Sequence, residues 1–267
     1  MKDRLIERKY THLKNFLKKL DSVVIAFSGG LDSGLLCKVS FEVLKDRAIA
    51  VTGVSPTYSE WELKEAKRIA REIGIRHIII KTNEFKNKNF LRNNFRRCYW
   101  CKRELFSKIK EIAKRESFGY ILDGTNYQDR DDHRPGLKAN KEFRIISPLH
   151  ECKFNKDQIR RLAKFLNLSF WNRPSGTCLA SRISFGEEIT FRRLKKIEKA
   201  EDVLRKFLGQ DILFRARDHR DILRIEIEKN ETLFKKKIER IVKDLKKLGY
   251  RYITLDLEGY LPAGKKV

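Results

Sequence analysis

One short segment constrains the fold more than any other: a strand-like apolar run, two glycines, and then a helix-like pattern. Residues 22–27 read SVVIAF, Gly29 and Gly30 interrupt the run, and residues 31–44 continue with helical spacing of apolar residues. This order predicts a buried strand that turns directly into a helix. Consecutive backbone N–H groups in such a turn can face one point, and the helix start adds partial positive charge. The segment therefore predicts a phosphate-binding loop.

Strand-like and helix-like patterns continue to alternate after this loop. Strands are expected at 48–54, 77–81 and 120–122, with helices around 61–73 and up to residue 114. Alternation of this kind predicts an α/β fold in which a parallel sheet is covered by helices on both faces.

The pattern changes near residue 187. A long helix up to Phe207 is expected there, followed by a hairpin of strands (212–217 and 222–228), a helix (232–248) and a strand (252–256). The segment before this change, 174–184, is expected to be a loop. We therefore predict a domain of residues 1–185 and a smaller C-terminal α+β domain of residues 186–267, which would bind substrate or mediate oligomerisation.

Charge and hydropathy limit the kinds of partner and the location that we expect for this protein. The chain has 61 Lys and Arg against 36 Asp and Glu, a net charge of +25, which predicts anionic partners, either nucleotides or nucleic acid. No apolar run approaches the roughly 20 residues that a membrane span needs. The first 20 residues are charged throughout, so we expect a cytoplasmic protein. In that reducing compartment, its five cysteines are better candidates for metal or sulfur chemistry than for disulfides.

The residues of the loop suit the phosphates of ATP. The hexapeptide SGGLDS lets the backbone approach phosphates at its glycines, its two serines can donate hydroxyl hydrogen bonds, and Asp32 can hold Mg²⁺. The alternative is that two glycines only form a turn. The expected ATP-binding residues are Ser28, Gly29, Gly30, Leu31, Asp32 and Ser33.

Three cysteines are candidate metal ligands. Cys98 and Cys101 have the two-residue gap that brings two thiolates to one ion, and they open a predicted helix. Cys178 lies in a glycine-containing loop and could be a third ligand. Three thiolates on a [4Fe-4S] cluster would leave one iron open to carry a transferable hydrosulfide. A structural zinc or a redox pair at Cys98 and Cys101 is the alternative, and Cys37 and Cys152 are expected to pack in the interior.

Two arginines alternate on one predicted strand. Arg215 and Arg217 therefore project from the same face, where their guanidinium groups could clamp a phosphate. The alternative is an exposed strand face in a very basic protein.

Longer stretches carry a resemblance to known families. The hexapeptide resembles the signature of the PP-loop ATP pyrophosphatase superfamily, and the chain as a whole is similar to the LarE family, the ATP-dependent sulfur transferases that build the nickel-pincer nucleotide cofactor. The matching stretches are AFSGGLDS (26–33), LDGTN (122–126), DDHRPGLKA (131–139), RRLA (160–163), SGTCLASRI (175–183) and RARDHRDILRIE (215–226).

The resemblance implies a reaction. A carboxylate of pyridinium-3,5-biscarboxylic acid mononucleotide would be adenylated by ATP, with release of pyrophosphate, and then converted to a thiocarboxylate with release of AMP. In some members the cysteine that matches Cys178 gives up its own sulfur, whereas Cys98 and Cys101 match the branch in which three cysteines hold a [4Fe-4S] cluster. Cys178, Asp32, Arg215 and Arg217 would be catalytic, and Gly124, Arg182, Glu201 and Glu226 would bind cofactor or substrate.

The resemblance also implies partners: a small-molecule nucleotide substrate, inorganic sulfide or another sulfur donor, and further copies of the chain in a homo-oligomer. A tRNA thiolase of the same superfamily is the alternative that the basic charge supports, although no added RNA-binding domain is evident. A third reading is a basic nucleotide-binding module with a structural zinc.

Overall fold

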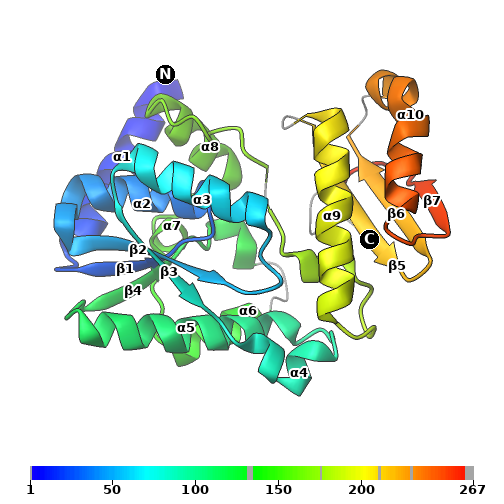
Figure 1. The fold of residues 1–267 in the computed structure, drawn as a ribbon. Coiled ribbons are helices and arrows are strands. Elements are labelled where there is room, and N and C mark those ends of the chain that lie inside the picture. Colours follow the sequence, from blue (N-terminus) through cyan, green and yellow to red (C-terminus); the bar gives the residue numbers. More distant parts are fainter. Residues whose placement is uncertain (1, 131–134, 175, 210–211, 229–230, 262–267) are drawn as a thin grey trace. The chain divides into compact units, whose positions relative to one another are not determined.

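The structure is a computed structural model that describes residues 2–130, 135–174, 176–209, 212–228 and 231–261, and Figure 1 shows its fold. The chain forms two compact units. Unit 1 comprises Met1–Ser55, Glu60–Phe90 and Phe95–Ser175, and unit 2 comprises Pro56–Ser59, Leu91–Asn94 and Gly176–Val267. The division into domains at residue 185 stays a prediction.

Unit 1 contains the predicted parallel sheet. Its strands are β1 (Val23–Ala26), β2 (Ala48–Val54), β3 (Arg76–Lys81) and β4 (Tyr120–Asp123), in the order β3-β2-β1-β4. All three strand pairs are parallel. The predicted α/β fold is therefore confirmed, and the carboxyl ends of the strands share one edge of the sheet.

Helices cover both faces of this sheet (Figure 1). One face packs against α1 (Lys2–Lys18), α2 (Leu31–Leu44), α3 (Glu60–Ile73) and α8 (Lys156–Phe165), and the other against α5 (Arg97–Arg115) and α6 (Gly136–Glu142). Side chains alternate along β1, so that Val23 and Ile25 enter the first core and Val24 enters the second. A strand buried on both faces must be apolar throughout, as residues 23–26 are.

Short elements complete unit 1: η1 (Lys45–Arg47), η2 (Glu84–Lys86), η3 (Tyr127–Arg130), α7 (Pro148–Glu151) and α4 (Lys88–Leu91), whose last residue belongs to unit 2. Asn155 caps α8. Its side chain accepts a hydrogen bond from the Gln158 backbone N–H at 2.9 Å, and the Gln158 side chain accepts one from the Asn155 backbone N–H at 3.1 Å. This capping box fixes where α8 begins.

Unit 2 has the predicted order of helix, hairpin, helix and strand. These elements are α9 (Phe191–Leu208), β5 (Phe214–His219), β6 (Ile222–Ile227), α10 (Glu231–Lys246) and β7 (Tyr252–Leu255). β5 and β6 are antiparallel, β6 and β7 are parallel, and β5 and β7 are the two edges. The segment predicted as a loop contains one short element, η4 (Leu179–Arg182), because Leu179 and Ala180 are buried.

Among the described helices, none combines the length and the apolar character that crossing a membrane would require.

Candidate active site

The loop of Ser28 to Ser33 connects β1 to α2 at the carboxyl edge of the sheet. The Ser28 backbone N–H donates to the Ser33 hydroxyl at 3.3 Å, and the two hydroxyl oxygens are 3.2 Å apart. Gly29 has a φ of +70°, and a Cβ there would lie 3.0 Å from Cβ of Ala66. Both the backbone conformation and the close approach of α3 therefore require glycine.

Asp32, in the first turn of α2, joins three segments of unit 1. Its Oδ1 accepts a hydrogen bond from Nζ of Lys156 at 2.5 Å, and its Oδ2 accepts one from Nδ2 of Asn126 at 3.0 Å. Lys156 is the first residue of α8, and Asn126 follows β4. A carboxylate beside a phosphate loop is the ligand that Mg²⁺ bound to nucleotide phosphates usually takes from a protein, so Asp32 fits that ion.

Asp123, at the end of β4, is the centre of a second polar group. It accepts hydrogen bonds from the side chains of Thr125, Asn140 and Ser147, each at 2.7 Å, and from Nζ of Lys102 at 3.3 Å. Burial alone would raise the pKa of Asp123, but the Lys102 charge and these hydrogen bonds outweigh burial and hold the pKa below its ordinary value. Asp123 is therefore a buried anion with all its partners in place.

Gly124 connects this group to the phosphate loop. A Cβ at this position would lie 2.8 Å from the backbone nitrogen of Ser33, so any side chain would displace the start of α2. The close approach gives a physical reason for glycine at this predicted site residue.

The five cysteines fall into two classes, and none is in a disulfide. Cys37 and Cys152 are buried, which raises the pKa of both thiols, that of Cys152 to about 11. Cys98 is exposed, and Cys101 and Cys178 are half-buried. The interior packing predicted for Cys37 and Cys152 is confirmed, and thiolate chemistry is left to the other three.

Cys98 and Cys101 lie near the start of α5 in unit 1, and Cys178 directly precedes η4 in unit 2. Within either unit, the described residues contain no group of three or more His, Cys, Asp or Glu side chains that could hold a metal ion. Three accessible thiols are nevertheless the donor set that suits an iron–sulfur cluster. The convergence of these three cysteines on one cluster stays a prediction.

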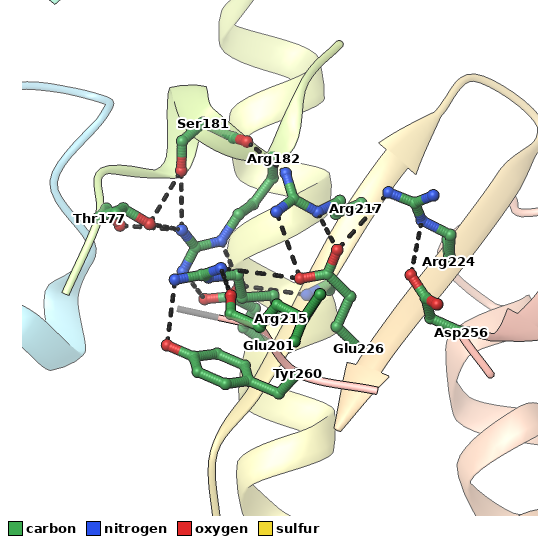
Figure 2. A network of polar contacts seen from close by, with 12 residues as sticks. Thr177, Ser181, Arg182, Glu201, Arg215, Arg217, Arg224, Glu226, Asp256 and Tyr260 are labelled. Carbon is green, nitrogen blue, oxygen red and sulfur yellow. Dashed lines mark hydrogen bonds and ion pairs between the residues drawn. The ribbon is translucent and has the colours of Figure 1, made fainter. Parts of the chain in front are cut away.

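Unit 2 contains a cluster of arginines and carboxylates, which Figure 2 shows and which we call the arginine cluster. Its members are Arg182, Glu201, Arg215, Arg217, Arg224, Glu226 and Asp256. Arg182 donates from Nε to Glu201 at 2.8 Å and from a terminal nitrogen to the Thr177 carbonyl at 3.0 Å. Glu201 also accepts the backbone N–H of Ala216 at 3.2 Å, which ties η4 and α9 to the edge strand β5.

Glu226 is the buried centre of the arginine cluster, with 0% of its surface exposed. Arg217 donates to both of its carboxylate oxygens, and Arg224 and Arg215 lie 3.5 and 3.7 Å away. Burial is the main reason that the pKa of Arg215 lies below its ordinary value; the charges of Arg182 and Arg217 add to this, while Tyr260 and Glu226 oppose it. Four arginines against three carboxylates leave the arginine cluster one positive charge in excess.

The structure thus brings the predicted site residues together in two groups. The phosphate loop contacts Gly124 in unit 1. In unit 2, Arg182 pairs with Glu201, Arg215 and Arg217 pair with Glu226, and Glu201 also accepts the backbone N–H of Ala216 between the two arginines of β5. Asp131–Arg134 and Ser175, which belong to the matching stretches, lie outside the described residues. The roles predicted for all of these residues stay predictions.

Four residues around the loop were not predicted individually: Lys102, Asp123, Asn126 and Lys156. Asp123 and Asn126 follow a predicted strand, which places them at the carboxyl edge where ligands of open parallel sheets bind. The position after a strand is therefore a sequence signal for Asp123 and Asn126. No such signal points to Lys156, at the start of α8, or to Lys102, within α5.

Comparison with known proteins identifies the family of this chain. The family model described as NAD synthase matches residues 5–97. Uncharacterized proteins from Synechocystis and Methanocaldococcus jannaschii are 38% and 35% identical, over 96% and 95% of this chain and 96% and 97% of their own lengths. The pyridinium-3,5-bisthiocarboxylic acid mononucleotide synthase of Lactiplantibacillus plantarum is 35% identical over 91% of this chain and 88% of its own length. With that identity over nearly its full length and an intact phosphate loop on a parallel sheet, the chain belongs to the LarE-like family of PP-loop ATP pyrophosphatases.

Proposed function

We propose that this protein is an ATP-dependent sulfur transferase that converts a carboxylate of pyridinium-3,5-biscarboxylic acid mononucleotide into a thiocarboxylate. The observation that carries the proposal is the phosphate loop with Asp32 held by Lys156 and Asn126, in a chain 35% identical to a synthase of the bisthiocarboxylic acid mononucleotide. The phosphate loop supports adenylation by ATP, and the product named for the relative indicates the class of substrate.

Activation of the carboxylate is the task of unit 1. A carboxylate oxygen attacks the α-phosphate of ATP, the α–β bond breaks, and pyrophosphate leaves. The serine hydroxyls and backbone N–H groups of the loop would hold the phosphates, and Asp32 would hold the Mg²⁺ that offsets their charge. Lys156, 2.5 Å from Asp32, adds a second cation at the same place.

Recognition of the substrate is assigned to unit 2. Arg215 and Arg217 would contact the phosphate of the mononucleotide, since guanidinium groups match phosphate oxygens in pairs. Glu226 holds the Arg217 guanidinium in a fixed orientation before the substrate arrives. Arg182 and Glu201, buried against β5, hold the segment that carries Cys178.

Sulfur transfer completes the reaction. A hydrosulfide attacks the acyl carbon of the adenylate, the carbon–oxygen bond to AMP breaks, and the thiocarboxylate and AMP leave. Cys98, Cys101 and Cys178 would hold a [4Fe-4S] cluster, which would supply this sulfur from its remaining iron. The other two cysteines take no part because their buried thiols resist ionisation.

The test combines metal analysis with product analysis on anaerobically purified protein. Iron and acid-labile sulfide should be present in the wild type and lost in Cys98→Ser, Cys101→Ser and Cys178→Ser. Cys152→Ala is the matched control, because it removes a cysteine whose thiol is buried, and it should retain iron.

Incubation with ATP, Mg²⁺, sulfide and the biscarboxylic mononucleotide should give a product in which sulfur replaces one carboxylate oxygen. Protein that contains zinc without iron, or loss of the Cys178 sulfur during turnover, would contradict the cluster. Formation of thiolated nucleosides in tRNA would replace the proposed substrate.

A further inference from the structure

The segment 256–261 follows β7 and folds back across the end of β6. The Asp256 backbone N–H donates to the Ile225 carbonyl at 2.8 Å, and the Tyr260 N–H donates to the Ile227 carbonyl at 2.9 Å. Gly259 makes the turn with a φ of +74°, and a Cβ there would lie 2.9 Å from the Ile227 carbonyl oxygen. Only glycine fits this turn, so the path of the segment is built into the sequence.

The segment 256–261 ends on Arg215, one of the two arginines assigned to the substrate phosphate. One terminal nitrogen of Arg215 donates to the Leu261 carbonyl at 2.8 Å. The other donates to the Tyr260 hydroxyl at 3.0 Å, as Figure 2 shows. The Tyr260 ring also lies 4.4 Å from the guanidinium carbon. Arg215 is 3% exposed, so a phosphate cannot reach these nitrogens while both contacts are made.

The contacts of Arg217 differ from those of Arg215, because its partner is a carboxylate within the sheet. Its side chain is 21% exposed, and its carboxylate partner Glu226 lies within β6 with no exposed surface. Glu226 cannot leave without opening the sheet. Arg215 also lies 3.7 Å from Glu226, but the two groups that accept its printed hydrogen bonds are a neutral carbonyl and a neutral hydroxyl on a segment outside the sheet. A phosphate dianion is a stronger acceptor for a guanidinium than either, so it can replace them.

We propose that the segment 256–261 covers Arg215 in the absence of substrate and leaves when the substrate phosphate binds. The inference rests on the proposed function, because it takes the phosphate of the mononucleotide as the ligand of Arg215. The apparent affinity equals the affinity of the open form multiplied by the fraction of molecules whose segment is open, so covering weakens binding. Tyr260 therefore regulates access to the substrate site.

The first test measures binding of nicotinic acid mononucleotide, a pyridinium carboxylate with a 5′-phosphate, by calorimetry. Tyr260→Ala should tighten binding about tenfold, and Tyr260→Phe should tighten it less, because only one hydrogen bond to a charged group is lost. Leu257→Ala is the matched control in the same segment, since Leu257 is 97% exposed, and it should bind like the wild type. In an Arg215→Ala background, Tyr260→Ala should have no further effect.

The second test uses inorganic phosphate and hydrogen exchange. Phosphate should accelerate exchange at the amides of Gly259 and Tyr260, which donate to the Asp256 and Ile227 carbonyls, and leave the Arg251 amide unchanged. If nicotinic acid mononucleotide binds wild type and Tyr260→Ala equally, or binds the variant more weakly, the covering role is wrong and the proposed function stands. If nicotinic acid mononucleotide binds neither protein but phosphate still opens the segment, the assignment of a pyridinium mononucleotide to Arg215 is wrong and the cover stands. If nicotinic acid mononucleotide does not bind and phosphate does not accelerate exchange in the segment, both the covering role and the assignment of a phosphate to Arg215 are wrong.

Discussion

Neutralising Asp32 should stop adenylation while leaving the protein folded. In Asp32→Asn, the Asn126 amide and the Lys156 ammonium lose the carboxylate that both contact, at 3.0 and 2.5 Å. Hydrogen bonds to a charged group are worth about 1.5–3 kcal/mol each, and the exposed fractions of 16% for Asp32 and 24% for Lys156 favour the lower end. Two such bonds at the lower end cost about 3 kcal/mol, which leaves a domain of ordinary stability, about 5–15 kcal/mol, folded.

The effect on chemistry should be larger than the effect on folding. Removing one positioned electrostatic group from an active site costs about 10²–10³ in turnover, or about 2.7–4 kcal/mol of barrier. Substrate-dependent pyrophosphate release, coupled to pyrophosphatase and phosphate detection, should therefore fall by that factor. Because the carboxylate is assigned to Mg²⁺, a higher Mg²⁺ concentration should restore part of the activity of Asp32→Asn.

Asp157→Asn is the matched control for this experiment. It removes the same charge one residue from Lys156, but the Asp157 side chain is 75% exposed and lies 3.9 Å from its partner Arg161. Pyrophosphate release by this variant should stay within about twofold of the wild type. The loop assignment is refuted if Asp32→Asn, folded by circular dichroism, releases pyrophosphate at a rate close to that of the wild type.

Three further predictions concern stability and reactivity. In folded protein from which iron has been removed, iodoacetamide at pH 8 should modify the exposed Cys98 but not Cys152, since a pKa of about 11 leaves roughly one Cys152 thiol in a thousand ionised. Peptide mass analysis before and after unfolding would show this difference. Glu226→Gln should lower the free energy of urea unfolding by about 3–5 kcal/mol, because three arginines lose a fully buried partner; a loss below about 1 kcal/mol would contradict that account. The pKa of Asp123 is lowered in the folded protein, so its contribution to stability is complete above its ordinary pKa of about 4 and is lost as the pH falls through the folded value. The difference in free energy of unfolding between wild type and Asp123→Asn should therefore shrink in acid. A difference that grew in acid would refute this reasoning.

Local signals in the sequence predicted the elements and the phosphate loop. The strand, glycine pair and helix around Gly29 are contiguous, and the alternation of Arg215 and Arg217 needs only the period of a strand. The partner of Asp32 could not be predicted in this way, because Lys156 lies 124 residues further along the chain. The cover on Arg215 comes from Tyr260, 45 residues away, through a turn whose single signal is Gly259. Such contacts depend on where the sheet edges bring distant segments, and no local pattern contains that information.

The contacts within unit 1 also connect the phosphate loop to the cysteine helix. The Ser33 backbone packs against Gly124, and the preceding residue, Asp123, accepts a hydrogen bond from Lys102 of α5. Lys102 directly follows Cys101, so the side chain that anchors α5 to the sheet edge is adjacent to a predicted cluster ligand. The residue next to this thiol therefore contacts the same buried carboxylate that borders the phosphate loop. The proposed reaction, in which a carboxylate is activated and then receives sulfur, would need these two parts close together, and the contacts of Asp123 connect them within unit 1.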